Sequence, residues 1–177
     1  MSQESGLEEH RAAAPRSGIA VGILTVSDTR TPETDGSGDL IASLVEGAGH
    51  RVAVRAILPD DPERIGPWLD DRIDRVDVAA VLITGGTGIS PRDQTYETLL
   101  NRLTKPLPGY GELFRMLSYA EIGAATILSR AVGGLMGPIV VLSMPGSKAA
   151  VRLAMEKIIL PELGHLVREA TKTGPPL

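Results

Sequence analysis

The sequence of 177 residues contains no cysteine, and only 3% of its residues are aromatic. The absence of cysteine excludes disulfide bonds, catalysis by a thiolate and metal sites with cysteine ligands. With so few aromatic rings, the hydrophobic core must be built from Val, Ile, Leu and Ala. Buried parallel strands are rich in such aliphatic residues, so the composition favours a parallel sheet covered by helices.

The sequence also lacks an excess of positive charge and a long hydrophobic run. Its 18 basic residues are outnumbered by 22 acidic ones, and the net charge of −4 gives no indication of a nucleic acid or an anionic membrane as partner. No apolar stretch is long enough to span a bilayer. The first 17 residues are polar and lack the apolar region of a signal peptide. We therefore expect a cytoplasmic protein with no membrane partner.

The length fits a single domain with a substantial core, and we see no internal repeat or dividing linker. We expect this domain to cover residues 18–171. A disordered N-terminal tail over residues 1–17 and a C-terminal tail over residues 172–177 are predicted from their polar or Gly- and Pro-containing composition.

Three well-known motifs of nucleotide-binding and hydrolytic sites are missing. The pattern GxxxxGK[ST] of P-loop NTPases is absent, the G-x-G triplets do not extend to G-x-G-x-x-G, and the G-x-S-x-G elbow of hydrolases is absent. The histidines His10, His50 and His165 do not have the spacing of metal ligands. The chain must therefore use a different kind of site.

The first half of the chain is patterned as alternating strands and helices. Apolar runs predict strands at Ile19–Val26, Arg51–Leu58 and Val78–Ile83. Helical spacing predicts one helix around Leu40–Val45 and a second from Pro62 to about Ile73. Right-handed crossovers in such a β-α-β-α-β unit make its three strands parallel.

The second half is less regular. Thr95 is expected to cap a short helix, Pro106 and Pro108 to break the chain, and a helix to restart over Glu112–Leu117, extending to Ile122 at most. The turn Met136-Gly137-Pro138 precedes a strand at Ile139–Leu142 and predicts an antiparallel hairpin, so the sheet is mixed. Two closing helices are predicted at Lys148–Ile159 and Glu162–Thr171.

Polar turns follow four of the predicted strands. They are Ser27-Asp28, Asp60-Asp61, Thr84–Asp93 and Ser143–Ser147. The carboxyl ends of parallel strands lie along one edge of a sheet, which is where open α/β sheets bind ligands. These turns are therefore predicted to converge on one site.

The turn at Thr84–Asp93 is the most informative of the four. Its glycines Gly85, Gly86 and Gly88 allow positive φ and a close approach of a ligand to backbone N–H groups. Asp93, five residues after Gly88, can hold Mg²⁺ against phosphate oxygens. The segment predicts a phosphate or nucleotide site.

Each of the other turns also has a structural explanation. Asp61 before Pro62 fits a helix cap, whereas Asp60 fits a solvated turn as well as a functional site. Asp28 can serve its own loop through local hydrogen bonds. The turn Pro145-Gly146-Ser147 can simply start a helix, or it can bind an anion at the helix N-terminus. These alternatives stay open at the level of the residues.

Six motifs taken together resemble the molybdenum cofactor biosynthesis proteins of the MogA/MoaB type, including the gephyrin G domain. The resemblance extends from about Ile19 to Leu166 and is closer to the MoaB branch. The motifs are Thr25-Val26-Ser27-Asp28, Leu58-Pro59-Asp60-Asp61, Thr84-Gly85-Gly86-Thr87-Gly88 with Arg92-Asp93, Pro108-Gly109-Tyr110-Gly111-Glu112, Leu128-Ser129-Arg130 and Met144-Pro145-Gly146-Ser147.

The resemblance implies a three-layer α/β/α sandwich, the molybdopterin-binding fold, with a mostly parallel sheet and an antiparallel edge strand. It also implies assembly as a homo-oligomer, either a trimer or a hexamer. Active members of the family use Mg²⁺ and ATP to adenylylate the terminal phosphate of molybdopterin, and they release pyrophosphate. A molybdopterin adenylyltransferase is therefore the expected function.

The resemblance carries over to individual residues. The two critical acids of the family match Asp60 and Asp93, to which we assign Mg²⁺ handling and positioning. The substrate- and nucleotide-binding residues are then expected at four places: Ser27 and Asp28 in the pocket; Thr84, Gly85, Gly86, Thr87 and Gly88 on phosphates; Ser129 and Arg130 on the pterin side; Pro145, Gly146 and Ser147 on nucleotide or pterin.

Two other functions are compatible with the same fold. A non-catalytic molybdopterin-binding protein is one alternative, and the presence of both Asp60 and Asp93 argues against it. A nucleotide hydrolase like the N-terminal domain of CinA-type proteins is the other, and it would act without any pterin.

Overall fold

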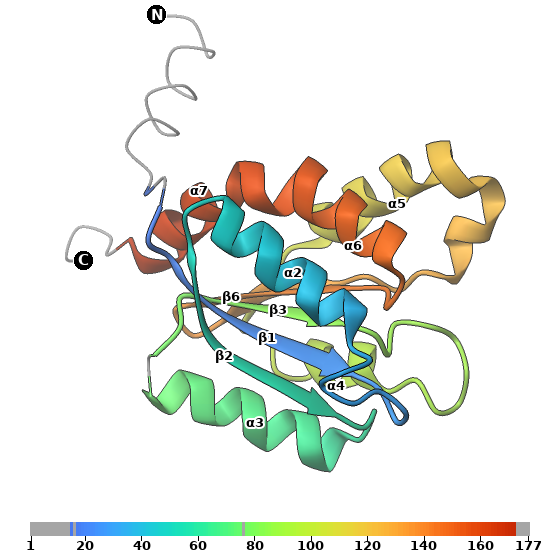
Figure 1. Ribbon diagram of the computed structural model, residues 1–177, viewed down its shortest axis with the longest axis horizontal. Helices are drawn as coiled ribbons and strands as arrows, with labels where there is room; N and C mark the ends of the chain where they lie inside the picture. The colour runs from blue at the N-terminus through green and yellow to red at the C-terminus, as the bar shows by residue number, and fades with distance from the viewer. Residues whose placement is uncertain (1–14, 16, 76, 173–177) are drawn as a thin grey trace, which may run out of the picture.

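A mixed sheet forms the centre of the molecule (Figure 1), in a computed structural model that describes residues 15, 17–75 and 77–172. Its strand order in this part of the chain is β2-β1-β3-β6-β5-β4. The strands are β1 (Ala20–Val26), β2 (Arg51–Leu58), β3 (Ala80–Thr84), β4 (Lys105–Pro106), β5 (Gly133–Met136) and β6 (Ile139–Met144). The predicted N-terminal and C-terminal tails lie almost entirely outside the described residues.

The four long strands are parallel, as predicted for the first three. β1 pairs in parallel with β2 and β3, and β3 pairs in parallel with β6. β5 runs the other way and forms the predicted hairpin with β6, with Gly137 of the connecting turn at φ 56°. The two-residue strand β4 pairs antiparallel with β5 at the edge of the sheet.

Helices cover both faces of the sheet and give three layers (Figure 1). On one face lie α2 and the helices of the chain's end, and on the other lie α3 and α4. The helical segments are α2 (Gly36–Gly47), α3 (Pro62–Arg75), α4 (Thr95–Leu100), α5 (Pro108–Ile122), the 3₁₀-helix η1 (Gly123–Leu128), α6 (Lys148–Ala154), the π-helix η2 (Met155–Ile159) and α7 (Leu160–Thr171).

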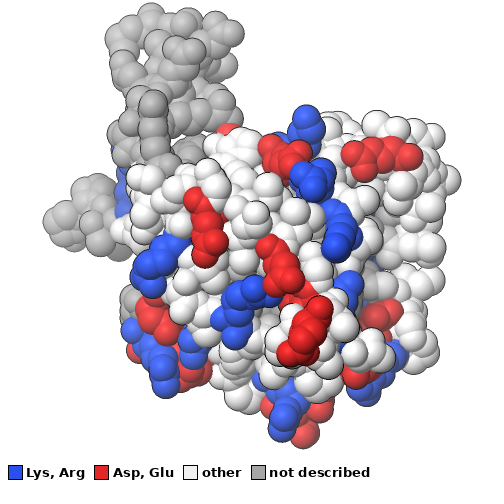
Figure 2. Space-filling model, in the orientation of Figure 1, with Lys and Arg blue, Asp and Glu red and all other residues white. Residues whose placement is uncertain are grey.

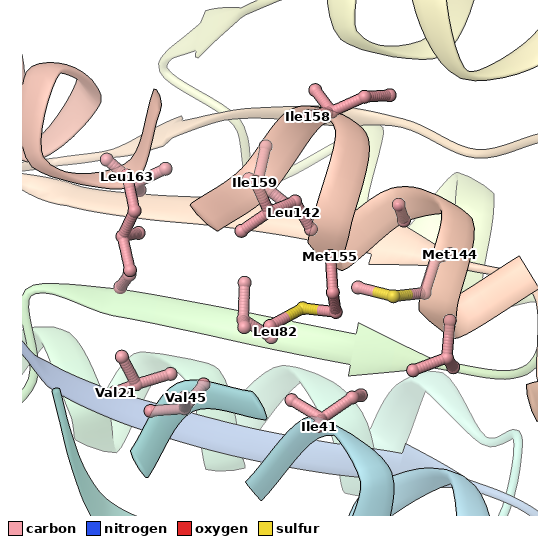
Figure 3. Close-up of a cluster of buried hydrophobic side chains, with 14 of the residues drawn as sticks. Val21, Ile41, Val45, Leu82, Leu142, Met144, Met155, Ile158, Ile159 and Leu163 are labelled. Carbon is pink, nitrogen blue, oxygen red and sulfur yellow. The ribbon is translucent and has the colours of Figure 1, made fainter. Parts of the chain in front are cut away.

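Two hydrophobic clusters, one on each face, explain why the strands read as continuous apolar runs. In β3, Leu82 packs into the cluster with α2 and α7, while Val81 and Ile83 pack into the cluster with α3 and α4. Figure 3 shows Leu82 between Ile41 of α2 and Met155 of η2. Strands buried on both faces need an apolar side chain at every position. The two clusters therefore confirm the core of aliphatic residues that the composition predicts.

Three helix boundaries differ from the prediction. α2 begins at Gly36, four residues before Leu40, because Asp35 caps it by accepting from the Gly38 N–H at 3.0 Å. α5 begins at Pro108, which was expected to break the chain. Proline at the first position of a helix loses no hydrogen bond, since that N–H has no partner within the helix.

The third difference concerns Pro161. We predicted that the helix from Lys148 would reach Ile159 and that a new helix would follow. Instead the chain stays helical to Thr171, with a π-helical turn over Met155–Ile159 in which the Leu160 N–H bonds to the Met155 carbonyl. The wider turn lets proline enter without the clash that it causes in a regular α-helix.

Two features of the described residues concern membranes and nucleic acids: the hydropathy of the helices and the charge pattern on one face of the surface. No helix in the described ranges is both long enough and apolar enough to cross a membrane. On the face drawn in Figure 2, basic and acidic side chains are interspersed. The charge distribution on this face is therefore not that of a nucleic-acid-binding surface.

His50, at the start of β2, makes the stability depend on pH. Its side chain is buried, and its Nδ1 accepts a hydrogen bond from the Ile19 N–H at 3.4 Å. Burial lowers the pKa of His50 below its usual value. As the pH falls through about 6.5, the unfolded chain binds a proton that the folded chain does not, so the free energy of unfolding decreases.

We expect urea unfolding between pH 7.5 and 5.5 to show this decrease, and His50→Gln to reduce it. Ser43→Ala, at an exposed position of α2 without a titratable side chain, is the control and should keep the wild-type pH dependence. An unchanged pH dependence in His50→Gln would contradict the assignment.

Candidate functional site

The polar turns that follow the parallel strands meet at one edge of the sheet, as predicted. In register, Thr25 of β1 pairs with Thr84 of β3, and Thr84 pairs with Met144 of β6. The residues after these three positions therefore leave the sheet side by side. Two hydrogen bonds join the turn after β6 to the start of the glycine loop. Thr84 Oγ1 donates to the Pro145 carbonyl at 3.2 Å, and the Gly85 N–H donates to the Met144 carbonyl at 3.0 Å.

The glycines of the loop after β3 are required by close packing. Gly85 has φ 103° and Gly86 has φ 65°, values that other residues rarely adopt. A Cβ on Gly85 would lie 2.2 Å from the Val26 carbonyl oxygen, and one on Gly86 would lie 2.5 Å from Oδ2 of Asp60. A Cβ on Gly88 would lie 2.6 Å from Oδ2 of Asp93. The loop thus lies directly against both predicted acids.

Asp60 is a buried carboxylate with only part of its hydrogen-bonding capacity used. It is 7% exposed, and its Oδ1 accepts from the Thr95 hydroxyl at 2.9 Å. Its Oδ2 is buried and accepts no hydrogen bond from any described residue. Burial raises the pKa of Asp60, and the negative charges of Asp93 and Asp28 raise it further. Such a carboxylate favours a bound cation.

Asp93 packs against the loop at Gly88, and its Oδ2 accepts from the Ser90 N–H at 2.9 Å. Within the described residues, no group of three or more acidic or histidine side chains is arranged to hold a metal ion. Mg²⁺ needs fewer protein ligands, because it is bound through one or two carboxylates together with waters and substrate phosphates. The oxygen atoms of Asp60 and Asp93 therefore fit Mg²⁺ that arrives with a phosphorylated ligand.

Arg130 holds the glycine loop in place. Its Nε donates to the Gly88 carbonyl at 2.6 Å and its Nη2 to the Asp93 carbonyl at 2.9 Å, and its backbone N–H donates to the Thr87 carbonyl at 3.0 Å. The guanidinium also pairs with Glu97 and lies 5.0 Å from the centre of the Tyr96 ring. These contacts give Arg130 a positioning role, and a contact with pterin stays a prediction.

The remaining predicted residues divide between local roles and the site. Ser129 next to Arg130 has a buried Oγ with no hydrogen-bond partner among the described residues. Ser147 caps α6 by accepting from the Ala150 N–H at 3.1 Å, and Gly146 accepts from Arg30 at 2.8 Å. Asp61 is the predicted helix cap, since its Oδ1 accepts from the Glu63 N–H at 2.9 Å.

Ser27 has the local loop role that sequence reasoning considered for Asp28, and both residues line a pocket. Ser27 Oγ serves its own loop by accepting from the N–H groups of Thr29 and Arg30 at 3.3 and 3.2 Å. Asp28 instead forms an ion pair with Arg92, 64 residues further along the chain. The pair lowers the pKa of the Asp28 carboxyl, mainly through the hydrogen bond from Arg92.

A pocket of about 700 Å³ lies beside Asp28, and sequence reasoning named only Ser27 and Asp28 among its lining residues. Asp35, 1% exposed, accepts from the Thr25 hydroxyl at 2.7 Å and lies 3.5 Å from both Arg30 and Arg55. The Asp-Gly-Ser-Gly run at 35–38 could have indicated a helix cap, but Arg55 within a strand gives no signal. The lining residues are Ser27, Asp28, Arg30, Thr31, Pro32, Asp35, Arg55, Ala56, Ile57 and Pro59.

A second pocket of about 300 Å³ lies on the other side of the Asp28–Arg92 pair. It is lined by Asp60, Asp61, Pro62, Pro91, Arg92 and Gln94. Two pockets beside the polar turns define the class of protein: a three-layer α/β protein with a candidate ligand site at the carboxyl edge of its sheet.

The comparisons with known proteins give the family. Residues 22–165 match the family model described as "Probable molybdopterin binding domain". Molybdenum cofactor biosynthesis protein B of Halalkalibacterium halodurans is 50% identical over 167 residues, which is 94% of this chain and 98% of that protein. The chain therefore belongs to the molybdenum cofactor biosynthesis family with this domain, and within it to the proteins of the MoaB type.

Solved structures agree with this assignment. A crystal structure of a molybdenum cofactor biosynthesis protein B has a TM-score of 0.85 at 50% identity and covers 88% of this chain and 98% of its own. The tungsten cofactor synthesizing protein MoaB from Pyrococcus furiosus has a TM-score of 0.79 at 36% identity, over 90% of this chain and all of its own. The resemblance inferred from the six motifs is confirmed.

The packing of the glycine loop gives a direct test. In Gly86→Ala, the new Cβ would lie 2.0 Å from the Thr95 hydroxyl and would also push on Asp60, in a backbone conformation that costs an L-residue about 1–2 kcal/mol. We expect the free energy of unfolding to fall by at least about 2 kcal/mol, measured by chemical denaturation.

Gly47→Ala is the control, because a Cβ there has nothing within 4 Å and Gly47 ends a helix. This variant should be at least as stable as the wild type. Equal stability of the two alanine variants would show that the loop does not pack as described.

Proposed function

We propose that this protein transfers AMP from ATP to the terminal phosphate of molybdopterin and releases pyrophosphate. The observation that carries the proposal is that Asp60 and Asp93 pack against Gly86 and Gly88 of the glycine loop, with Oδ2 of Asp60 buried and unpartnered in the described structure. Both the ATP requirement and the role of Mg²⁺ belong to this proposal.

The reaction needs little covalent help from the protein. An oxygen of the molybdopterin phosphate attacks the α-phosphorus of ATP, the bond from this phosphorus to the bridging oxygen breaks, and pyrophosphate leaves. Because the nucleophile is already an anion, the difficulty is to bring two negatively charged groups together. Mg²⁺, when bound, would neutralise part of the phosphate charge.

The residues of the site supply position and charge stabilisation. Asp60 and Asp93 would hold the cation, and the backbone N–H groups after Gly85 would donate to phosphate oxygens where charge develops. Arg130 keeps these N–H groups in place through the carbonyls of Thr87, Gly88 and Asp93. A preorganised loop costs no reorganisation during the reaction, which is how such donors accelerate phosphoryl chemistry.

The test is incubation of the purified protein with molybdopterin, ATP and Mg²⁺, followed by mass spectrometry for adenylylated molybdopterin and pyrophosphate. A product that requires both Mg²⁺ and the pterin establishes the transferase. Binding of molybdopterin without turnover of ATP would support the non-catalytic alternative. Hydrolysis of ADP-ribose in the absence of pterin would instead support a nucleotide hydrolase.

The two acids are expected to be essential. Asp60→Asn and Asp93→Asn should each lower AMP transfer by at least about 100-fold, since each removes a charge that positions the cation. Asp74→Asn is the matched control, because Asp74 is exposed at the end of α3 and lines neither pocket. This variant should keep near wild-type activity, and full activity in Asp93→Asn would refute the cation assignment.

Asp60→Asn should also be more stable than the wild type at neutral pH. A buried carboxylate whose Oδ2 accepts nothing destabilises the fold, and the neutral amide removes that charge. Denaturation without divalent cations should show a gain of about 1 kcal/mol in the free energy of unfolding.

Self-association belongs to the proposal as well, because α5 and η1 present an uncovered apolar face. Monomeric proteins rarely expose a contiguous patch of this kind, and closed homo-oligomers bury such surfaces between identical copies. A trimer or hexamer, as the resemblance implies, would cover it. The exposed residues of the face are Leu113, Met116, Tyr119, Ile122, Ile127 and Leu128.

Met116→Glu should weaken this association. Met116 is 63% exposed, and a carboxylate there would be buried without a partner in an oligomer. We expect sedimentation equilibrium to give a dissociation constant at least tenfold higher. A change on this order corresponds to the loss of one buried Met contact. Arg64→Glu, on α3 in the opposite layer, should leave the association unchanged. A monomeric wild type at micromolar concentration would contradict the proposed assembly.

A further inference from the structure

Arg92 is a cation of the site to which neither the motifs nor the proposed function assigns a role. It forms a two-point ion pair with Asp28, in which Nε donates to Oδ2 at 2.9 Å and Nη2 donates to Oδ1 at 2.8 Å. The pair joins the loop after β1 to the loop after β3. Both side chains are exposed, Arg92 at 62% and Asp28 at 41%.

The pair stands between the two pockets of the site. Asp28 lines the pocket of about 700 Å³, whose floor includes Ala56 and Ile57 and suits an aromatic ring system. Arg92 lines the pocket of about 300 Å³, together with Asp60. The smaller pocket has room for a compact group such as a diphosphate, whose charge Arg92 and a cation held by Asp60 would balance.

Arg92 also differs from Arg30 and Arg130 in how its donors are used. Arg30 is held by Gly146, Asp35 and Ser37, and Arg130 is held by Gly88, Asp93 and Glu97. The hydrogen bonds that Arg92's side chain donates in the described structure all go to one carboxylate, that of Asp28.

Exchange of this partner is energetically easy. An exposed ion pair contributes only about 0–1 kcal/mol, so breaking it costs little. A guanidinium binds phosphate with the same two-point geometry that it uses for a carboxylate. A polyphosphate carries more charge than Asp28 and would compete with it effectively.

We propose that Arg92 binds the pyrophosphate part of ATP in the smaller pocket, where its guanidinium exchanges Asp28 for phosphate oxygens. The inference rests on the proposed function. As the bond between the α-phosphorus and the bridging oxygen breaks, negative charge develops on the departing pyrophosphate. The Arg92 N–H donors stabilise that charge. The exposed position of Arg92 leaves an open path for the product.

The experiment measures binding of inorganic pyrophosphate with Mg²⁺ by calorimetry, separately from AMP transfer. We expect Arg92→Gln to weaken pyrophosphate binding at least tenfold and to lower kcat/KM for ATP about 100-fold, with the KM for molybdopterin unchanged. Arg92→Lys should recover part of the binding, because it keeps the charge and loses the two-point geometry.

Asp28→Asn distinguishes exchange from a purely structural ion pair. If the pair only fastens the two loops, both Asp28→Asn and Arg92→Gln weaken pyrophosphate binding. If Arg92 exchanges partners, Asp28→Asn removes the competitor and pyrophosphate binds several-fold more tightly. Arg75→Gln is the matched control, since Arg75 is 63% exposed and pairs with Asp71 at 3.0 Å on α3, away from the site.

The possible results separate this inference from the proposed function. Wild-type affinity for pyrophosphate in Arg92→Gln overturns the inference, as does weaker binding in Asp28→Asn. Failure of the wild type to adenylylate molybdopterin overturns the proposed function, whether or not the protein binds pyrophosphate. Circular dichroism and thermal unfolding of each variant exclude loss of the fold as the cause.

Discussion

The parallel register of β1, β3 and β6 is the constraint on which the site depends. Thr25, Thr84 and Met144 stand next to one another in the sheet, so the chain leaves three neighbouring strands at the same level. The turn after β3 can then pack on the Val26 carbonyl and on Asp60 only because Gly85 and Gly86 have no side chain. A shift in the register of these strands would move the glycine loop away from the Val26 carbonyl and from Asp60.

The charge arrangement around this loop carries a cost for the fold. Burial raises the pKa of Asp60, the nearby charges of Asp93 and Asp28 raise it further, and the buried Oδ2 of Asp60 has no partner in the described structure. A core that served stability alone would not keep such a group. Its presence is understandable in a site that is complete only when a cation and a phosphorylated ligand are bound.

Much of the fold could be predicted because it follows from local pattern. The strands were recognisable as apolar runs, and the hairpin was recognisable by its turn. The helix cap at Asp61 was recognisable by the proline that follows it. The starts of α2 and α5 were missed, since the caps at Asp35 and Pro108 looked like loop chemistry. The π-helical turn before Pro161 depends on how the last helices pack, so periodicity could not show it.

The sequence by itself determined the order of strands and helices, the apolar core and the positions of Asp60, Asp93 and the glycines. These features depend on neighbours within a few residues or on periodic patterns. The tertiary structure alone decided that Arg130 holds the loop of Thr87 and Gly88, and that Asp28 pairs with Arg92 rather than with its own turn. Such partners are 40 or more residues apart, and only the folded sheet brings them together.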